Sequence, residues 1–118
     1  MLFDPKWDAK LRTELWRQVL LEAADYIDRV GWCQHSLRDD NGHVCAAEAL
    51  MTVGYTAHDV ATYAGAMAAL SNFVTSGEHS MALVKWNDDE GRTAAEVTGT
   101  MRACALAFAP YETADPED

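Results

Sequence analysis

The segment from Asp8 to Val30 places the strongest constraint on the fold, because it has the period of an amphipathic helix. At about 100° per residue, its apolar side chains fall on one face and its charged side chains on the other. The apolar face comprises Leu15, Trp16, Val19, Leu20, Ala23, Tyr26, Ile27 and Val30. Gly31 follows as a residue that can adopt the left-handed conformation that ends a helix. The sequence therefore predicts one long helix with a single buried face.

Two shorter helices are predicted in the middle of the chain. Residues 44–53 have a helical pattern that we expect to end at Gly54. The run Thr56-Ala57-His58-Asp59 has the form of a capping box, so a third helix is expected from there to about Thr75. This helix carries a stripe of large apolar residues and a stripe of small ones, which favours packing on two sides.

The last helix is predicted from the capping box Thr93-Ala94-Ala95-Glu96 to about Phe108. It also has two stripes, so we expect it to lie at the centre of the bundle or to be shared with a second subunit. The stripe opposite its large residues is Ala95, Gly99, Ala103 and Leu106. Before it, the apolar run 81–86 fits either a short strand or a buried turn.

These elements predict a mostly α fold: a compact single-domain bundle of about four helices. The domain is expected over residues 1–110, with a short irregular or extended segment near 80–86. Residues 111–118 contain four acidic residues and no basic one, which is typical of a frayed acidic tail.

The charge balance excludes several classes of function. Nineteen acidic residues stand against nine basic ones among 118 residues, which leaves a formal charge of −10. A nucleic-acid binder needs a basic stripe that displaces counterions from phosphates. No apolar run reaches the roughly 18 residues of a membrane span, and no secretory leader pattern is present. Three cysteines, an odd number, favour reduced thiols. We therefore expect a cytoplasmic protein that binds neither nucleic acid nor membrane.

Four residues in one polar connection have the chemistry of metal ligands. Cys33-x-His35 and His43-x-Cys45 form a mirrored pair of thiolate and imidazole groups, which zinc prefers. Residues 37–48 imitate a calcium loop whose last ligand position is Glu48, but Leu37 offers no side-chain oxygen at the first ligand position. A turn with solvent-facing histidines and a core cysteine explains the pattern better. We therefore predict no cofactor and keep these four residues as the metal alternative.

A nucleophilic arrangement is a second candidate. Cys45 lies near a predicted helix N-terminus, where the partial positive charge lowers a thiol pKa. His79 follows, and then Asn87 or Asp88, which is the chain order of papain-like hydrolases. The likeness is one of order alone. It defines the alternative of a small cysteine-dependent hydrolase or transferase.

A set of short motifs lies mostly at two turns of the chain. It comprises Gly31-Trp32-Cys33-Gln34, Gly42-x-x-Cys45 with Ala49-Leu50, Trp86-Asn87-Asp88, and Gly91-Arg92-Thr93 with Glu96-Val97. Together these motifs resemble a small uncharacterised family of actinobacteria and their phages. That family often has Gly after the Gln, where this chain has His35. The resemblance covers roughly residues 11–108 and implies an accessory protein of the host cytoplasm, with no activity assigned.

The motif residues at these turns form either a structural clasp or the floor of a site, and we favour the clasp. Arg92 is expected to pair with Asp39, Asp40 or Asp88 and so to lock the turns together. Trp32 and Trp86 serve either as pocket walls or as covers of the core. The residues predicted to bind a partner are Trp32, Gln34, Trp86, Asn87, Asp88 and Arg92.

Small size, acidity and two-sided helices favour an interaction protein that binds a host protein without catalysis. A homodimer through the small-residue stripe of the last helix is a secondary hypothesis. Mimicry of nucleic acid is a minor version of the binding hypothesis, because the acidic residues are scattered through turns and the tail.

Overall fold

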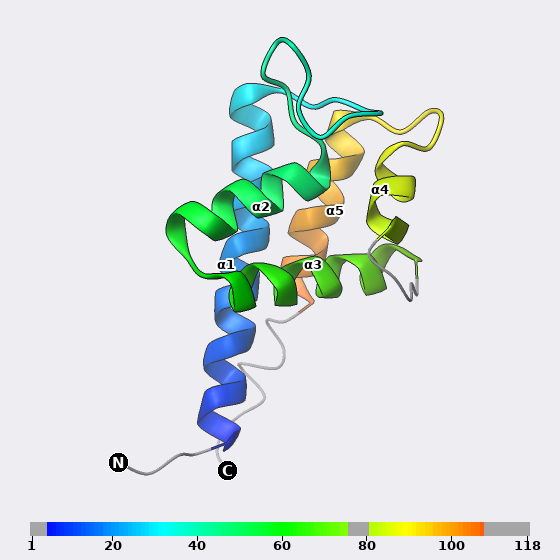
Figure 1. Cartoon of the computed structure of the whole chain (residues 1–118). Coiled ribbons are helices and arrows are strands. Elements are labelled where there is room, and N and C mark those ends of the chain that lie inside the picture. Colours follow the sequence, from blue (N-terminus) through cyan, green and yellow to red (C-terminus); the bar gives the residue numbers. More distant parts are fainter. Residues whose placement is uncertain (1–4, 76–80, 108–118) are drawn as a thin grey trace.

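The computed structural model describes residues 5–75 and 81–107, and these residues form five helices (Figure 1). They are α1 (Pro5–Val30), α2 (Ala46–Ala57), α3 (Val60–Thr75), α4 (Met81–Asn87) and α5 (Ala94–Leu106). The long α1 contacts α2, α3 and α5, and α4 packs against α2 and α3. The predicted mostly α bundle is confirmed. Within the described ranges, no helix combines the length and the apolar character needed to cross a membrane.

The buried face of α1 is the one that the periodicity predicts. Val19, Leu20, Ala23 and Ile27 are at most 2% exposed. They share one hydrophobic core with large buried side chains of the other four helices, namely Leu50, Leu70, Leu83, Val97 and Met101. Burial of this apolar surface is the main force that holds α1 against the shorter helices.

The segment predicted to be irregular or extended is instead the helix α4, which overlaps residues 80–86. Its seven residues bury Ala82 and Leu83 on one side and end at the fully buried Asn87. A run this short has no clear period, so its packing against α2 and α3 determines its conformation. The bundle therefore has one helix more than predicted.

The boundary between α2 and α3 also differs from the prediction. α2 continues through Gly54 to Ala57, and a Cβ atom at Gly54 would overlap the Cβ of Tyr63 on α3. Gly54 is therefore a point of close helix approach and not a helix end. α3 begins after Asp59, whose Oδ1 accepts a hydrogen bond of 2.8 Å from Thr62 N.

α5 begins with the predicted capping box, in which Thr93 and Glu96 exchange two hydrogen bonds of 3.1 Å. Its large stripe is buried, whereas its small stripe is exposed. α5 therefore lies at the side of this chain's bundle and not at its centre. Phe108 and the acidic tail 111–118 lie outside the described residues.

Candidate functional site

The two turns that carry the motif lie side by side at one end of the bundle (Figure 1). The connection from Trp32 to Cys45 folds back on itself through isolated β-bridges, Trp32 with Val44 and Arg38 with Val44. Its ends then meet the turn that follows α4. The arrangement brings together residues that are more than 50 positions apart in the sequence.

Asn87 is the centre of this contact and is 0% exposed. Its Oδ1 accepts hydrogen bonds from Trp32 Nε1 at 2.8 Å and from Ala46 N at 3.0 Å. Its Nδ2 donates to Cys33 O at 3.2 Å and to Asp88 Oδ1 at 3.0 Å. Both donors and both acceptor positions of the amide are therefore used within the protein.

Gln34 and Asp88 complete the contact from either side. Gln34 Nε2 donates to the carbonyl oxygens of Asn87 and Asp89 at 3.1 and 2.8 Å. Asp88 Oδ1 accepts from His35 N at 2.9 Å. We call Trp32, Gln34, Asn87 and Asp88 the clasp, because their side chains join the two turns by hydrogen bonds.

His35 is held in a backbone conformation that its residue type rarely adopts. Its φ angle is +69°, in the left-handed region that glycine enters without cost. A glycine at this position would adopt the same conformation without a steric penalty. The bond from His35 N to Asp88 is one of the contacts that hold this turn.

Arg92 does not pair with Asp39, Asp40 or Asp88, so that prediction was wrong. Its Nη2 instead bonds Asp89 Oδ2 at 2.9 Å, and its Nε donates to Trp86 O at 3.0 Å. The guanidinium carbon lies 4.5 Å from the centroid of the Trp86 ring. Arg92 therefore stabilises its own turn, between α4 and α5, and does not bridge to the other one.

The tryptophans of the two turns, Trp32 and Trp86, are both partly buried and pack against the hydrophobic core. Trp32 also donates its indole N–H to Asn87. Trp86 is covered on one face by the Arg92 guanidinium. These contacts support the role of core covers for both rings.

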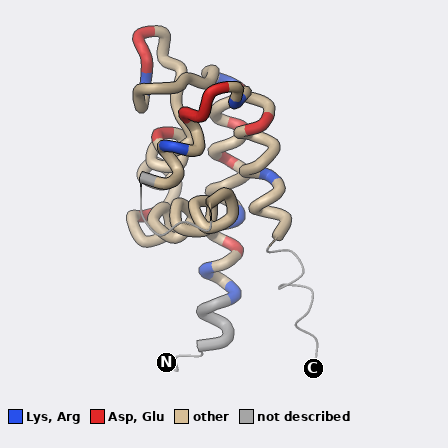
Figure 2. The backbone as a smooth tube through the Cα atoms, turned by 90° about the vertical axis from the view of Figure 1, so that its right-hand side faces the viewer, with Lys and Arg blue, Asp and Glu red and all other residues tan. Residues whose placement is uncertain are grey.

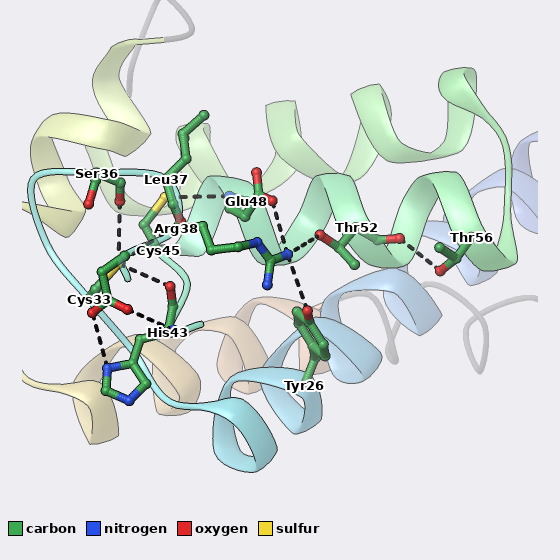
Figure 3. Close-up of polar contacts among 11 residues, drawn as sticks. Tyr26, Cys33, Ser36, Leu37, Arg38, His43, Cys45, Glu48, Thr52 and Thr56 are labelled. Carbon is green, nitrogen blue, oxygen red and sulfur yellow. Dashed lines mark hydrogen bonds and ion pairs between the residues drawn. The ribbon is translucent and has the colours of Figure 1, made fainter. Parts of the chain in front are cut away.

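Cys33 and Cys45 are buried, with 8% and 3% exposure. Cys33 Sγ lies 3.4 Å from the carbonyl oxygens of both Ser36 and His43 (Figure 3). Cys45 is the N-cap of α2, and its Sγ accepts a hydrogen bond from Glu48 N at 3.4 Å. Burial raises the pKa of both thiols. Cys45 therefore lacks the lowered pKa expected of a nucleophile.

The remaining members of the catalytic alternative are placed as follows. His79 lies outside the described residues. Asn87 is engaged in the clasp, and Asp88 accepts bonds from its neighbour Asn87 and from His35 N. The described geometry therefore gives the hydrolase alternative no support.

The metal alternative also gains no support from the geometry. The side chain of His35 is 74% exposed and lies 3.9 Å from Asp88, while His43 Nδ1 lies 3.1 Å from Asp39 Oδ2. Within residues 5–75 and 81–107, no three His, Cys, Asp or Glu side chains gather as a metal site would require. Glu48, the last ligand position of the calcium-like loop, instead forms an ion pair of 3.1 Å with Arg38.

Arg38 forms a network that the sequence analysis missed. Its Nη2 lies 3.1–3.3 Å from Tyr26 Oη, Glu48 Oε2 and Thr52 Oγ1, so it ties the loop to α1 and α2 (Figure 3). A lone arginine in a turn gives no sequence signal for such a role, because its partners come from two separate helices.

A groove was also missed, and it lies away from the clasp. It has a volume of about 640 Å³ and opens between α1, α3 and the end of α5. The residues that line it are Trp16, Gly65, Ala68, Ala69, Asn72, Phe73, Cys104 and Ala107, and none of them is charged. The available sequence signal is that the sixteen residues of α3 contain no Asp, Glu, Lys or Arg.

Most charged residues of the described part of the chain lie on α1 and on the turns (Figure 2). α3 exposes Val60, Ala61, Ala64, Ala68, Asn72, Phe73 and Thr75. A surface helix normally turns a charged or strongly polar face to water. We call these exposed residues, with the groove beside them, the uncharged surface.

Comparison with known proteins identifies a family but no function. A family model described as "Family of unknown function (DUF6197)" matches residues 12–107. The matched span includes both motif turns, α3 and the groove. Neither the curated proteins nor the solved structures contain a significant match.

Proposed function

We propose that this chain, which belongs to the DUF6197 family, is a small acidic accessory protein that acts by binding another protein. The observation that carries the proposal is the uncharged surface on α3 and its groove. The clasp then has a structural role: it fixes the turns at one end of the bundle.

The internal bonding of the clasp supports this division of roles. Of the residues predicted to bind a partner, Asn87 is fully buried, and Trp32, Gln34 and Asp88 donate to or accept from groups of this chain. A ligand that used these groups would first have to break those bonds. Each such bond is worth about 1 kcal/mol, and an unpaired buried group costs more.

The uncharged surface has the features of a contact region instead. Phe73 is 47% exposed at the edge of the groove, and Val60 is 57% exposed at the other end of α3. Small residues between them, such as Ala64 and Ala68, allow a second helix to approach closely. Exposed apolar patches bordered by polar residues are typical of protein contact sites.

The chemistry of the partner follows from the two kinds of surface. An apolar helix fits the groove, and basic residues beside that helix would complement a chain of net charge −10. We infer a host protein as the partner, because the resemblance noted for the motif turns is to a family of actinobacteria and their phages. On this proposal the protein acts in the host cytoplasm.

The test is capture of partners from an actinobacterial lysate by tagged protein, with two variants matched in exposure. Phe73 and Leu37 are each 47% exposed, and they lie at the groove and in the 32–45 loop respectively. Phe73→Glu is expected to lose a stoichiometric partner, and Leu37→Glu is expected to keep it. Equal retention by both variants would refute binding at the groove, and the lack of any stoichiometric partner would refute the proposal.

A homodimer is a second candidate, favoured by the exposed small stripe of α5. Around Gly99, an added Cβ would meet no atom within 4 Å, so the helix surface is open there. Leu106 at the end of the stripe is 64% exposed. Sedimentation velocity tests this candidate: a dimer that Gly99→Glu converts to monomer supports it, and a monomer at high concentration removes it.

A further inference from the structure

Cys33 and Cys45 lie opposite each other where the two ends of the 32–45 loop meet. The bridge between Trp32 and Val44 is parallel: Cys33 N donates to Val44 O at 3.1 Å, and Val44 N donates to Gly31 O at 2.9 Å. In a parallel pair, the residues that follow the bridged ones are neighbours in register. Their side chains leave the backbone on the same side. Cys33 and Cys45 are these two residues.

The spacing of the two backbones suits a disulfide. Neighbouring strands lie about 4.8 Å apart, and disulfides join residues with Cα atoms roughly 4.4–6.8 Å apart. The Cys33 thiol lies against the carbonyl oxygens of Ser36 and His43, and the Cys45 thiol accepts from Glu48 N (Figure 3). Burial, and more weakly the charge of Cys33, raises the pKa of Cys45, as expected for neighbouring thiols.

We propose that Cys33 and Cys45 form a dithiol that a small-molecule disulfide oxidises to an internal disulfide bond. The Cys33 thiolate, the more exposed of the two, attacks one sulfur of the oxidant and breaks its S–S bond. One small thiol leaves, and Cys33 carries a mixed disulfide. The Cys45 thiolate then attacks Cys33 Sγ and releases the second small thiol. Two electrons pass from the protein to the oxidant, and the two thiol protons leave on the released thiols.

The new bond would join Cys33, three residues after the end of α1, to Cys45, the N-cap of α2. The Asn87 side chain already bonds to Cys33 O and to Ala46 N, the amide that follows Cys45. The disulfide would therefore reinforce the contact that the clasp makes by hydrogen bonds. Because it restricts the unfolded chain, oxidation is expected to raise the melting temperature by at least ~4 °C.

The test uses the native, reduced full chain and oxidised glutathione as the oxidant. The product is alkylated and mapped by mass spectrometry without reduction. We expect the oxidised chain to be lighter by the mass of two hydrogen atoms before alkylation. We also expect a linked peptide that contains Cys33 and Cys45, and a peptide with Cys104 in alkylated form. Cys104 is the internal control, because it is also buried but lies on α5.

Single variants make the result decisive. Cys45→Ser keeps a side-chain oxygen at the N-cap of α2, so it is expected to fold. It should stop at the mixed disulfide on Cys33, whereas Cys104→Ser should still form the internal bond. A wild-type chain that stops at the mixed disulfide would overturn the proposal. Linkage that needs denaturant, or that involves Cys104 to the same extent, would also overturn it.

Discussion

Replacing Asn87 by alanine removes the centre of the clasp and tests its structural role. The substitution leaves Trp32 Nε1–H and Ala46 N–H without their acceptor, and Cys33 O without its donor. A buried group that loses its partner costs about 1–3 kcal/mol. Ala46 is fully buried, whereas Trp32 is only partly buried, so water can compensate at the ring. We expect a total loss of about 3 kcal/mol in the free energy of unfolding.

The measurement is urea denaturation of the wild type and of Asn87→Ala, followed by circular dichroism. A lower midpoint with an unchanged slope indicates a loss of native stability and not a change in compactness. Asn72→Ala is the matched control, because Asn72 is exposed on α3. Surface substitutions of this kind usually change stability by less than about 0.5 kcal/mol.

A double-mutant cycle with Trp32→Phe isolates the bond between the two turns. Trp32→Phe removes one donor to Asn87 Oδ1 and is expected to cost about 1 kcal/mol. Because the two residues share that bond, their effects should fail to add by at least about 0.5 kcal/mol. A loss below 1 kcal/mol for Asn87→Ala, or full additivity in the cycle, would refute the reasoning.

Four further substitutions test the helix packing, the loop conformation and the buried thiol on α5. Gly54→Ala should lower the free energy of unfolding by about 1–3 kcal/mol through its clash with Tyr63. Gly99→Ala lies in open space and should raise the free energy of unfolding by up to about 1 kcal/mol. Both are measured by urea denaturation, and equal effects would contradict close packing of α2 and α3 at Gly54. His35→Gly should stabilise by about 1 kcal/mol, because it relieves a left-handed conformation, and a lower denaturation midpoint would contradict this. Burial raises the pKa of Cys104 from its ordinary 9.0 to about 11. Its contribution is therefore fully present below pH 9 and is lost as the pH rises to 11, so the wild type should lose about 1–3 kcal/mol more over this range than Cys104→Ala.

The helical architecture was largely predictable, because the amphipathic pattern of α1 is long and defines the apolar face against which the shorter helices pack. Two errors arose where tertiary contacts outweigh local signals. The run that forms α4 is too short to show a period. Glycine commonly follows the last residue of a helix, so Gly54 was predicted to end one. In the structure, its lack of a side chain allows close contact with Tyr63 of α3, and no local sequence pattern reveals that contact.

The residues of the clasp stood out in the sequence, but the bonds between them did not. Turn residues such as Trp32 and Asn87 stood out by type and position. The partners of Gln34 are backbone carbonyls, which every residue has, so the sequence carries no signal for these bonds. Arg92 was predicted to reach the other turn, but an acceptor three residues away, Asp89, is closer along the chain.

The uncharged surface could be predicted only in part from the sequence. The sequence shows that α3 has no charge and two apolar stripes, and it predicts packing on two sides. Which stripe stays exposed depends on where α1 and α5 lie, and therefore on contacts between distant segments. The groove beside Trp16 and Phe73 exists only in the assembled bundle.

Hydrogen exchange of the chain with and without its captured partner tests the central claim most directly. We expect slower exchange of amides in α3 and at the end of α5, with the amides of residues 32–45 and 87–93 unchanged. Protection confined to those two turns, with α3 unchanged, would contradict the account. It would place the partner on the clasp instead.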